Sequence, residues 1–97
     1  MKLKSVTKTC SGINSDNRST SVLTNAQRSG LYSIYFTGNL GSYTIDGFVY
    51  VSSDNSMKIY GQNQVMQYVE YILNTNEIST RDSSITFTGT ATFYYWG

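Results

Sequence analysis

The sequence contains no histidine, no proline and a single cysteine, Cys10. Without histidine the chain lacks the commonest general base, the usual neutral metal ligand and every Ser-His or Cys-His pair. One cysteine excludes an intrachain disulfide and the zinc sites that several Cys and His residues build together. Cys10 is expected to be a small, half-buried residue rather than a nucleophile. We therefore expect no enzymatic activity, no cofactor and no metal site.

Charge is also scarce, because only 13% of the residues are charged and the net charge is +1. A chain with this balance has no strong field that attracts nucleic acid or a membrane surface. Residues 47–51 bear a faint likeness to an aromatic RNA-binding strand, but Asp46 stands where Lys or Arg is usual. Nucleic-acid binding is therefore not expected.

Long apolar runs are missing as well. No segment approaches the ~20 apolar residues of a membrane span, and residues 1–8 lack the apolar core of a signal peptide. We expect a protein that is synthesised in the cytoplasm without a signal peptide and has no membrane partner. Incorporation in a virion is compatible with this expectation.

Tyrosine is abundant, with nine residues, and Thr, Ser and Asn are frequent. This composition favours strands over helices. From Ile85 to Tyr95 the odd positions are mostly apolar, whereas threonines fill the even positions from Thr86 to Thr92. Because side chains on a strand alternate between its two faces, the pattern predicts one long strand that begins near Ser84. One of its faces is apolar and the other is coated with threonine.

Similar alternation recurs along the chain and sets the expected fold class. We expect one domain over residues 1–97, mainly β, built as an antiparallel β-sandwich or partly closed barrel of about six to eight strands. Its centre should be formed by strands 31–37, 42–52 and 84–96. The predicted core residues are Ile34, Phe36, Ile45, Val49, Val51, Val69, Ile85, Phe87, Phe93 and Tyr95.

Shorter elements are predicted from turn-forming residues and from local alternation. Strands are expected at 2–9, 19–24 and 57–60, and turns or loops at 10–18, 25–30, 38–41, 53–56, 74–77 and 80–83. Tyr32 is expected on the apolar face of its strand, together with Ile34 and Phe36. Gly89, in mid-strand, is expected where a sheet bends or where another backbone approaches closely.

Two segments allow more than one interpretation. Asp46 and Gly47 could form a two-residue hairpin turn, or residues 42–52 are one long strand that bends at Gly47. The alternation continues through Gly47 and favours the long strand. In residues 63–74 the apolar positions share one helical face, whereas Val, Tyr and Ile prefer strands. A short helix near 63–74 is slightly favoured.

Three lysines, Lys2, Lys4 and Lys8, share one side of the predicted first strand. Lysines in such a row commonly mark an exposed sheet edge, where they discourage pairing with another strand. The alternative is a strip that binds an anion. On either interpretation these lysines are candidate interaction residues.

The predicted function is that of a non-enzymatic structural or interaction protein, such as an accessory subunit of a phage particle. Tyr50, Tyr94 and Trp96 are candidate contact residues, because Tyr and Trp are favoured anchors in protein interfaces. Chain ends fray unless something holds them, so the aromatic residues 93–96 are expected to be held in the domain or against a neighbour.

Two alternative functions stay open. Aromatic rings beside hydroxyl and amide groups suit sugar stacking and hydrogen bonding, as in a small carbohydrate-binding module. A protein inhibitor is the other alternative, and the sequence does not separate it from an interaction protein. The expected partner is therefore another protein or a second copy of the chain, with a glycan as the alternative ligand.

Overall fold

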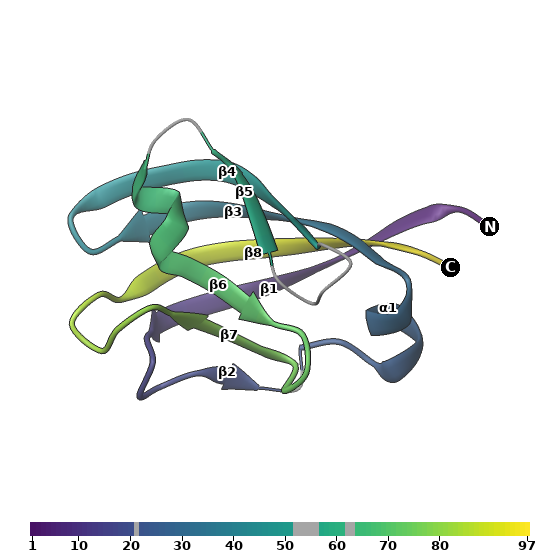
Figure 1. Ribbon diagram of the computed structural model, residues 1–97, viewed down its shortest axis with the longest axis horizontal. Coiled ribbons are helices and arrows are strands. Elements are labelled where there is room, and N and C mark those ends of the chain that lie inside the picture. Colours follow the sequence, from purple (N-terminus) through teal and green to yellow (C-terminus); the bar gives the residue numbers. More distant parts are fainter. Residues whose placement is uncertain (21, 52–56, 62–63) are drawn as a thin grey trace.

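Two antiparallel sheets pack face to face (Figure 1). The computed structural model describes residues 1–20, 22–51, 57–61 and 64–97, and for 51, 57–61 and 64–65 it describes the backbone alone. The large sheet has the order β1 (Leu3–Ile13), β8 (Phe87–Trp96), β3 (Leu31–Leu40), β4 (Tyr43–Val51) and β5 (Met57–Gly61). The small sheet has the order β2 (Ser19–Thr20), β7 (Glu77–Thr80) and β6 (Val69–Ile72). The mainly β, sandwich-like antiparallel fold expected from the sequence is confirmed.

Strand β8 lies between β1 and β3 in the large sheet. Phe87, Ala91 and Phe93 are fully buried on its inner face, and the threonines between them point to the outer face. The strand begins at Phe87 rather than near Ser84, because the preceding residues form a turn. There the backbone and the hydroxyl of Ser84 both donate to the Asp82 carboxylate.

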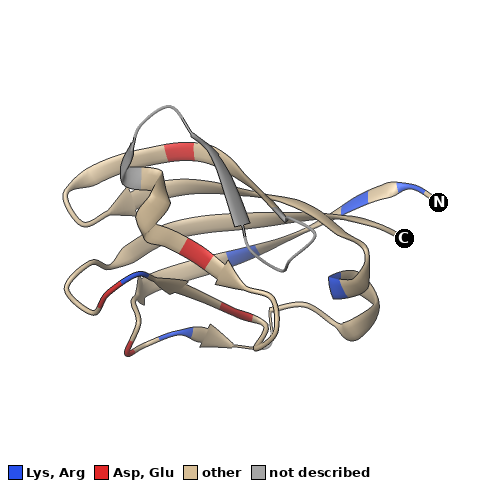
Figure 2. Ribbon diagram, in the orientation of Figure 1, with Lys and Arg blue, Asp and Glu red and all other residues tan. Residues whose placement is uncertain are grey.

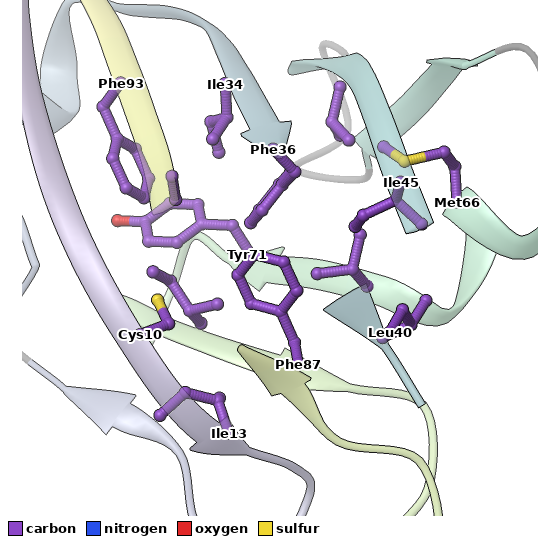
Figure 3. Close-up of a cluster of buried hydrophobic side chains, with 14 of the residues drawn as sticks. Cys10, Ile13, Ile34, Phe36, Leu40, Ile45, Met66, Tyr71, Phe87 and Phe93 are labelled. Atoms are coloured by element: carbon purple, nitrogen blue, oxygen red, sulfur yellow. The ribbon is translucent and has the colours of Figure 1, made fainter. Parts of the chain in front are cut away.

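The core fills the space between the sheets. Figure 3 shows Tyr71 of β6 beside Phe93 of β8, with ring centroids 5.1 Å apart. The predicted core residues Ile34, Phe36, Ile45, Val49, Val69, Phe87 and Phe93 are confirmed as buried. Ile85 and Tyr95 are only partly buried, and the side chain of Val51 is outside the described residues. The predicted core did not include Ile13, Leu23, Leu40, Met66, Tyr71, Ile78 and Ala91, which are buried as well, and Cys10, expected to be half-buried, is fully buried.

Strands β3 and β4 form a long hairpin whose turn is at residues 41–42. The prediction of a turn over 38–41 is wrong in part, since Gly38 to Leu40 belong to β3. The long-strand interpretation of 42–52 is confirmed for the described residues: Gly47 sits within β4, paired with Phe36 and Gly61. The strand predicted at 57–60 is confirmed as β5, while the turn predicted at 53–56 lies outside the described residues.

The helix predicted near 63–74 is wrong for most of its length. Residues Gln64–Tyr68 form a short 3-10 helix, η1, and Val69–Ile72 form strand β6. Residue 63 is outside the described part of the chain. Val69 and Tyr71 are buried and alternate with partly buried neighbours, as in a strand that pairs with β7. The strand preference of Val, Tyr and Ile thus outweighs their helical spacing.

Three segments between residues 1 and 30 also differ from the prediction. Strand β1 continues through Ile13, with a register shift after Cys10, so the predicted loop starts later. Strand β2 ends at Thr20, because Leu23 instead exchanges hydrogen bonds with the Asn76 side chain. The predicted loop 25–30 contains a one-turn helix, α1 (Asn25–Ser29), held by a capping box between Thr24 and Gln27.

Candidate functional site

The outer face of the large sheet carries a connected group of aromatic rings. Alternation along β3, β4 and β8 turns these side chains away from the core, on the side opposite the small sheet. The group consists of Tyr32, Tyr35, Phe48, Tyr50, Tyr94 and Trp96 and is called the aromatic face below. It contains the predicted contact residues Tyr50, Tyr94 and Trp96.

Phe48 lies at the centre of the aromatic face. Its ring centroid is 4.8 Å from that of Tyr35, 6.2 Å from Tyr50 and 6.3 Å from Tyr94. These separations fall in the range of favourable aromatic pairs. The Phe48 side chain is nevertheless 36% exposed. Contacts among the rings therefore fix their arrangement, but the rings stay accessible to solvent.

Tyr32 joins the aromatic face through a β-bulge, contrary to the expectation that it lies on the apolar inner face. Leu31 is opposite Tyr95 and Ser33 is opposite Tyr94, so β3 has one extra residue at this point. The extra residue turns Tyr32 outward, where it is 46% exposed. Its ring centroid lies 5.8 Å from Tyr50 and 6.0 Å from Trp96.

Trp96 combines a fixed backbone with an exposed ring. Its backbone N–H donates to the carbonyl of Gly30, and the next residue, Gly97, exchanges two backbone hydrogen bonds with Lys2. The end of β8 is therefore held in the sheet, as expected for the aromatic C-terminal segment. The indole itself is 44% exposed.

Hydroxyl groups surround the rings on the same face. Thr7 and Thr92 lie opposite each other on β1 and β8, and their hydroxyl oxygens are 3.1 Å apart. The Tyr35 hydroxyl donates to the Asp46 carboxylate, and this hydrogen bond is the main reason that the pKa of Tyr35 is raised. The surface is thus a mixture of aromatic rings and neutral hydroxyl groups, with the Asp46 carboxylate among them.

The lysines lie apart from the aromatic face. Lys4 and Lys8 are opposite Tyr95 and Ala91, which places both on the inner side of β1 with Val6. They stay exposed because β1 is the edge strand of the large sheet. Lys2 precedes the strand. Figure 2 shows the charged positions scattered over several elements, some of them adjacent in the sequence. The structure thus brings Tyr50, Tyr94 and Trp96 together and leaves the lysines on another surface.

Cys10 and the carboxylates offer little for catalysis. Burial raises the pKa of the Cys10 thiol, an effect that the charge of Lys8 partly offsets. The thiol is therefore protonated at neutral pH. A hydrogen bond from Thr75 and the neighbouring Arg18 lower the pKa of Glu77, which forms an ion pair with Arg18 at 3.2 Å. Nowhere in the described residues do three or more His, Cys, Asp or Glu residues gather as a metal would need.

Among the hollows lined by described residues, two open elsewhere on the molecule. One, of about 390 Å³, lies near the β3–β4 turn and is lined by Leu40, Gly41, Ser42, Tyr43, Tyr68, Ser84 and Ile85. The other, of about 360 Å³, is lined by Asn25, Arg28, Ser29, Leu73 and Asn74. Neither hollow includes a residue of the aromatic face. No helix in the described part of the chain is long and apolar enough to cross a membrane.

Comparison of the chain with models of protein families, with curated proteins and with solved structures finds no match. The function must therefore be argued from the aromatic face itself. Sequence reasoning missed Tyr32, Tyr35 and Phe48 as members of that face. For Phe48 the signal was present, since it shares the even positions of its strand with Tyr50.

Proposed function

We propose that this chain is a non-enzymatic interaction protein that binds another protein through the aromatic face. The single observation that supports this most strongly is the exposure of Tyr32, Phe48 and Trp96 within one connected group of rings. The solvated side of an antiparallel sheet is usually polar. Contiguous exposed aromatic surface instead marks interaction sites in soluble proteins.

The composition of the surface supports a protein partner. The centres of protein interfaces are enriched in Tyr, Trp and Phe and depleted in charge, and their rims are polar. Here the rings are bordered by threonines such as Thr92 and Thr90, on a sheet that is rigidly paired on both sides of β8. An accessory subunit of a phage particle, the setting suggested by size and composition, would dock on its scaffold through a surface of this kind.

Affinity capture with surface variants tests the proposal. The immobilised protein is exposed to an extract of the cells that produce it, as wild type, as Phe48→Ser and as Tyr43→Ser. Tyr43 is 61% exposed but lies on the inner side of β4, opposite Leu40, and serves as the matched control. The captured protein is then purified and titrated against each variant.

The expected result is that wild type and Tyr43→Ser bind with equal affinity, while Phe48→Ser binds at least tenfold more weakly. A partner that binds Phe48→Ser as tightly as wild type would show that contact is made elsewhere on the molecule. Circular dichroism melts of each variant ensure that a loss of binding does not come from a loss of fold.

A second candidate function is glycan binding. It is favoured by the neutral hydroxyl groups that lie directly beside the rings, such as Thr92 next to Tyr35. Rings for stacking and hydroxyls for hydrogen bonding are what a neutral sugar requires. The chain has one tryptophan, Trp96, and it lies on this face. A glycan array followed by a fluorescence titration would show a change in Trp96 emission if the ligand is a sugar, and none otherwise.

A further inference from the structure

The outer surface of the large sheet has two unlike halves along its strands. Toward the chain termini lie the large side chains Tyr32, Tyr50, Tyr94 and Trp96. Toward the β3–β4 turn lie the small side chains Thr9, Thr37, Thr44, Thr88 and Thr90. Between the halves, a central row runs across the strands through Thr7, Thr92, Tyr35 and Phe48.

We infer that this surface binds a second copy of the chain, in a dimer whose two-fold axis runs across the strands along the central row. The inference rests on the proposed function, because it names the partner of the same aromatic face. Such a rotation places the aromatic half of one copy over the threonine half of the other. Large side chains then meet small ones on both sides of the axis, which is how packed layers interdigitate.

The charge of the surface favours a second copy over a different protein. On β1, β8, β3 and the described side chains of β4, Asp46 is the only charged residue of the outer face. Interfaces between different proteins commonly rely on complementary charge for steering and specificity. The outer faces of these four strands offer no such complementarity, but they can be placed against their own copies without contacts between like charges.

The area of the surface is sufficient for a dimer. Four strands about 4.8 Å apart, each of ten residues at about 3.4 Å per residue, span roughly 650 Å². The accessible area is larger than this projection, because rings such as Trp96 stand out from the sheet. Specific interfaces bury about 800 Å² on each partner. The surface therefore meets the requirement of a dimer of ordinary size.

The first test is the molecular mass in solution. Sedimentation velocity of the full chain over a wide concentration range should show a species of twice 10.9 kDa. Emission from Trp96 should shift to shorter wavelength as this species forms, because the indole is then shielded from water. Phe48→Glu should weaken dimerisation at least tenfold, while Tyr43→Glu, on the other side of β4, should leave it unchanged.

The second test locates the axis. In a dimer of this symmetry, Thr92 lies close to its own counterpart, whereas Thr88 lies more than one row away on β8. Two packed sheets are about 10 Å apart, so a bismaleimide of about that length should cross-link Thr92→Cys to a dimer and Thr88→Cys far less. Wild type, whose Cys10 is buried, is the control for background reaction.

The outcomes separate this inference from the proposed function. A wild-type chain that is monomeric at every concentration, or a dimer that Phe48→Glu leaves intact, overturns the inference. If the monomer captures a different protein and loses it in Phe48→Ser, the proposed function holds and only the partner named here is wrong. A monomer whose Trp96 emission responds to a neutral oligosaccharide alone overturns both.

Discussion

Gly38 and Gly89 face each other across β3 and β8 at a distance that leaves no room for a side chain on either. A Cβ atom on Gly38 would lie 2.6 Å from the Cα of Gly89, and one on Gly89 would lie 2.7 Å from the Cα of Gly38. Each would also collide with a backbone carbonyl, of Thr88 or Thr37. The glycine pair therefore allows the backbones of β3 and β8 to approach each other closely at this point.

Replacing either glycine should be strongly destabilising. We expect Gly38→Ala to reduce the free energy of unfolding by about 2–4 kcal/mol, because the new methyl group collides with backbone atoms and alanine resists the φ of +147°. Gly12→Ala is the matched control, since Gly12 has a φ of +61° but nothing within 4 Å of an added Cβ. Gly12→Ala should reduce the free energy of unfolding by only about 1 kcal/mol, because alanine resists a positive φ. Equal losses in urea denaturation would contradict the close approach.

Truncation of buried rings should separate core from surface. Phe93→Ala and Phe87→Ala should each cost about 3–5 kcal/mol, because both rings are completely buried. Phe48→Ala should cost about 1 kcal/mol, since its ring is partly exposed on the outer face. Thermal melts in which Phe48→Ala lowers stability as much as Phe93→Ala would contradict the assignment of Phe93 to the core and of Phe48 to the surface.

The hydroxyl of Tyr71 predicts a loss of stability at alkaline pH. Burial raises the pKa of Tyr71 from 10.0 to about 12. The unfolded chain ionises this group first, so its contribution is complete below pH 10 and is lost as the pH rises through about 12. Urea midpoints from neutral pH upward should therefore fall less steeply in Tyr71→Phe than in wild type. An absorbance titration should show one fewer late-ionising tyrosine in the variant.

The side chain of Asn76 connects the β6–β7 turn to the segment before α1. Its oxygen accepts from the Leu23 N–H and from the Tyr71 hydroxyl, and its nitrogen donates to the Leu23 carbonyl at 2.7 Å. Asn76→Gly keeps the φ of 57° accessible but removes these bonds. We expect a loss of about 1–3 kcal/mol, as for other buried polar groups left without partners.

Two further variants isolate the cause of that loss. Asn76→Ala should be about 1 kcal/mol worse than Asn76→Gly, because alanine resists a positive φ. Asn74→Gly, at an exposed position of the same turn, should change the unfolding free energy by less than about 0.5 kcal/mol. If chemical denaturation ranked Asn74→Gly with Asn76→Gly, flexibility of the turn rather than its hydrogen bonds would be the determinant.

Strands with one apolar and one polar face could be predicted from the sequence, and this accounts for β8, β3 and β4. The structure of residues 64–72 could not be predicted, because the spacing of Tyr68, Val69 and Ile72 fits a helix. The outcome there depends on pairing with β7, which lies in another part of the sequence. Helix α1 was missed although its signal is present: Thr24 and Gln27 have the spacing of a capping box.

The candidate site was predictable only in part, for a related reason. Tyr50, Tyr94 and Trp96 follow from alternation, and extending the same rule from Tyr50 would have added Phe48. The outward position of Tyr32 depends on a bulge, which arises when two strands are paired and leaves no mark in the sequence of either. Surface and core could be assigned strand by strand, but not at the point where the register changes.

The central place of β8 has a consequence for the order in which the molecule is assembled. Strands β1 and β3 do not pair with each other, and β8, the strand that joins them, follows both in the sequence. Until residues 87–96 leave the ribosome, β1 and β3 each have an unpaired edge, and no strand connects β1 to the rest of the large sheet. Contacts between such distant segments form slowly. The large sheet is thus completed only when these residues become available, and a chain that lacks residues 87–96 leaves β1 without a partner strand and β3 with an open edge, both prone to aggregate.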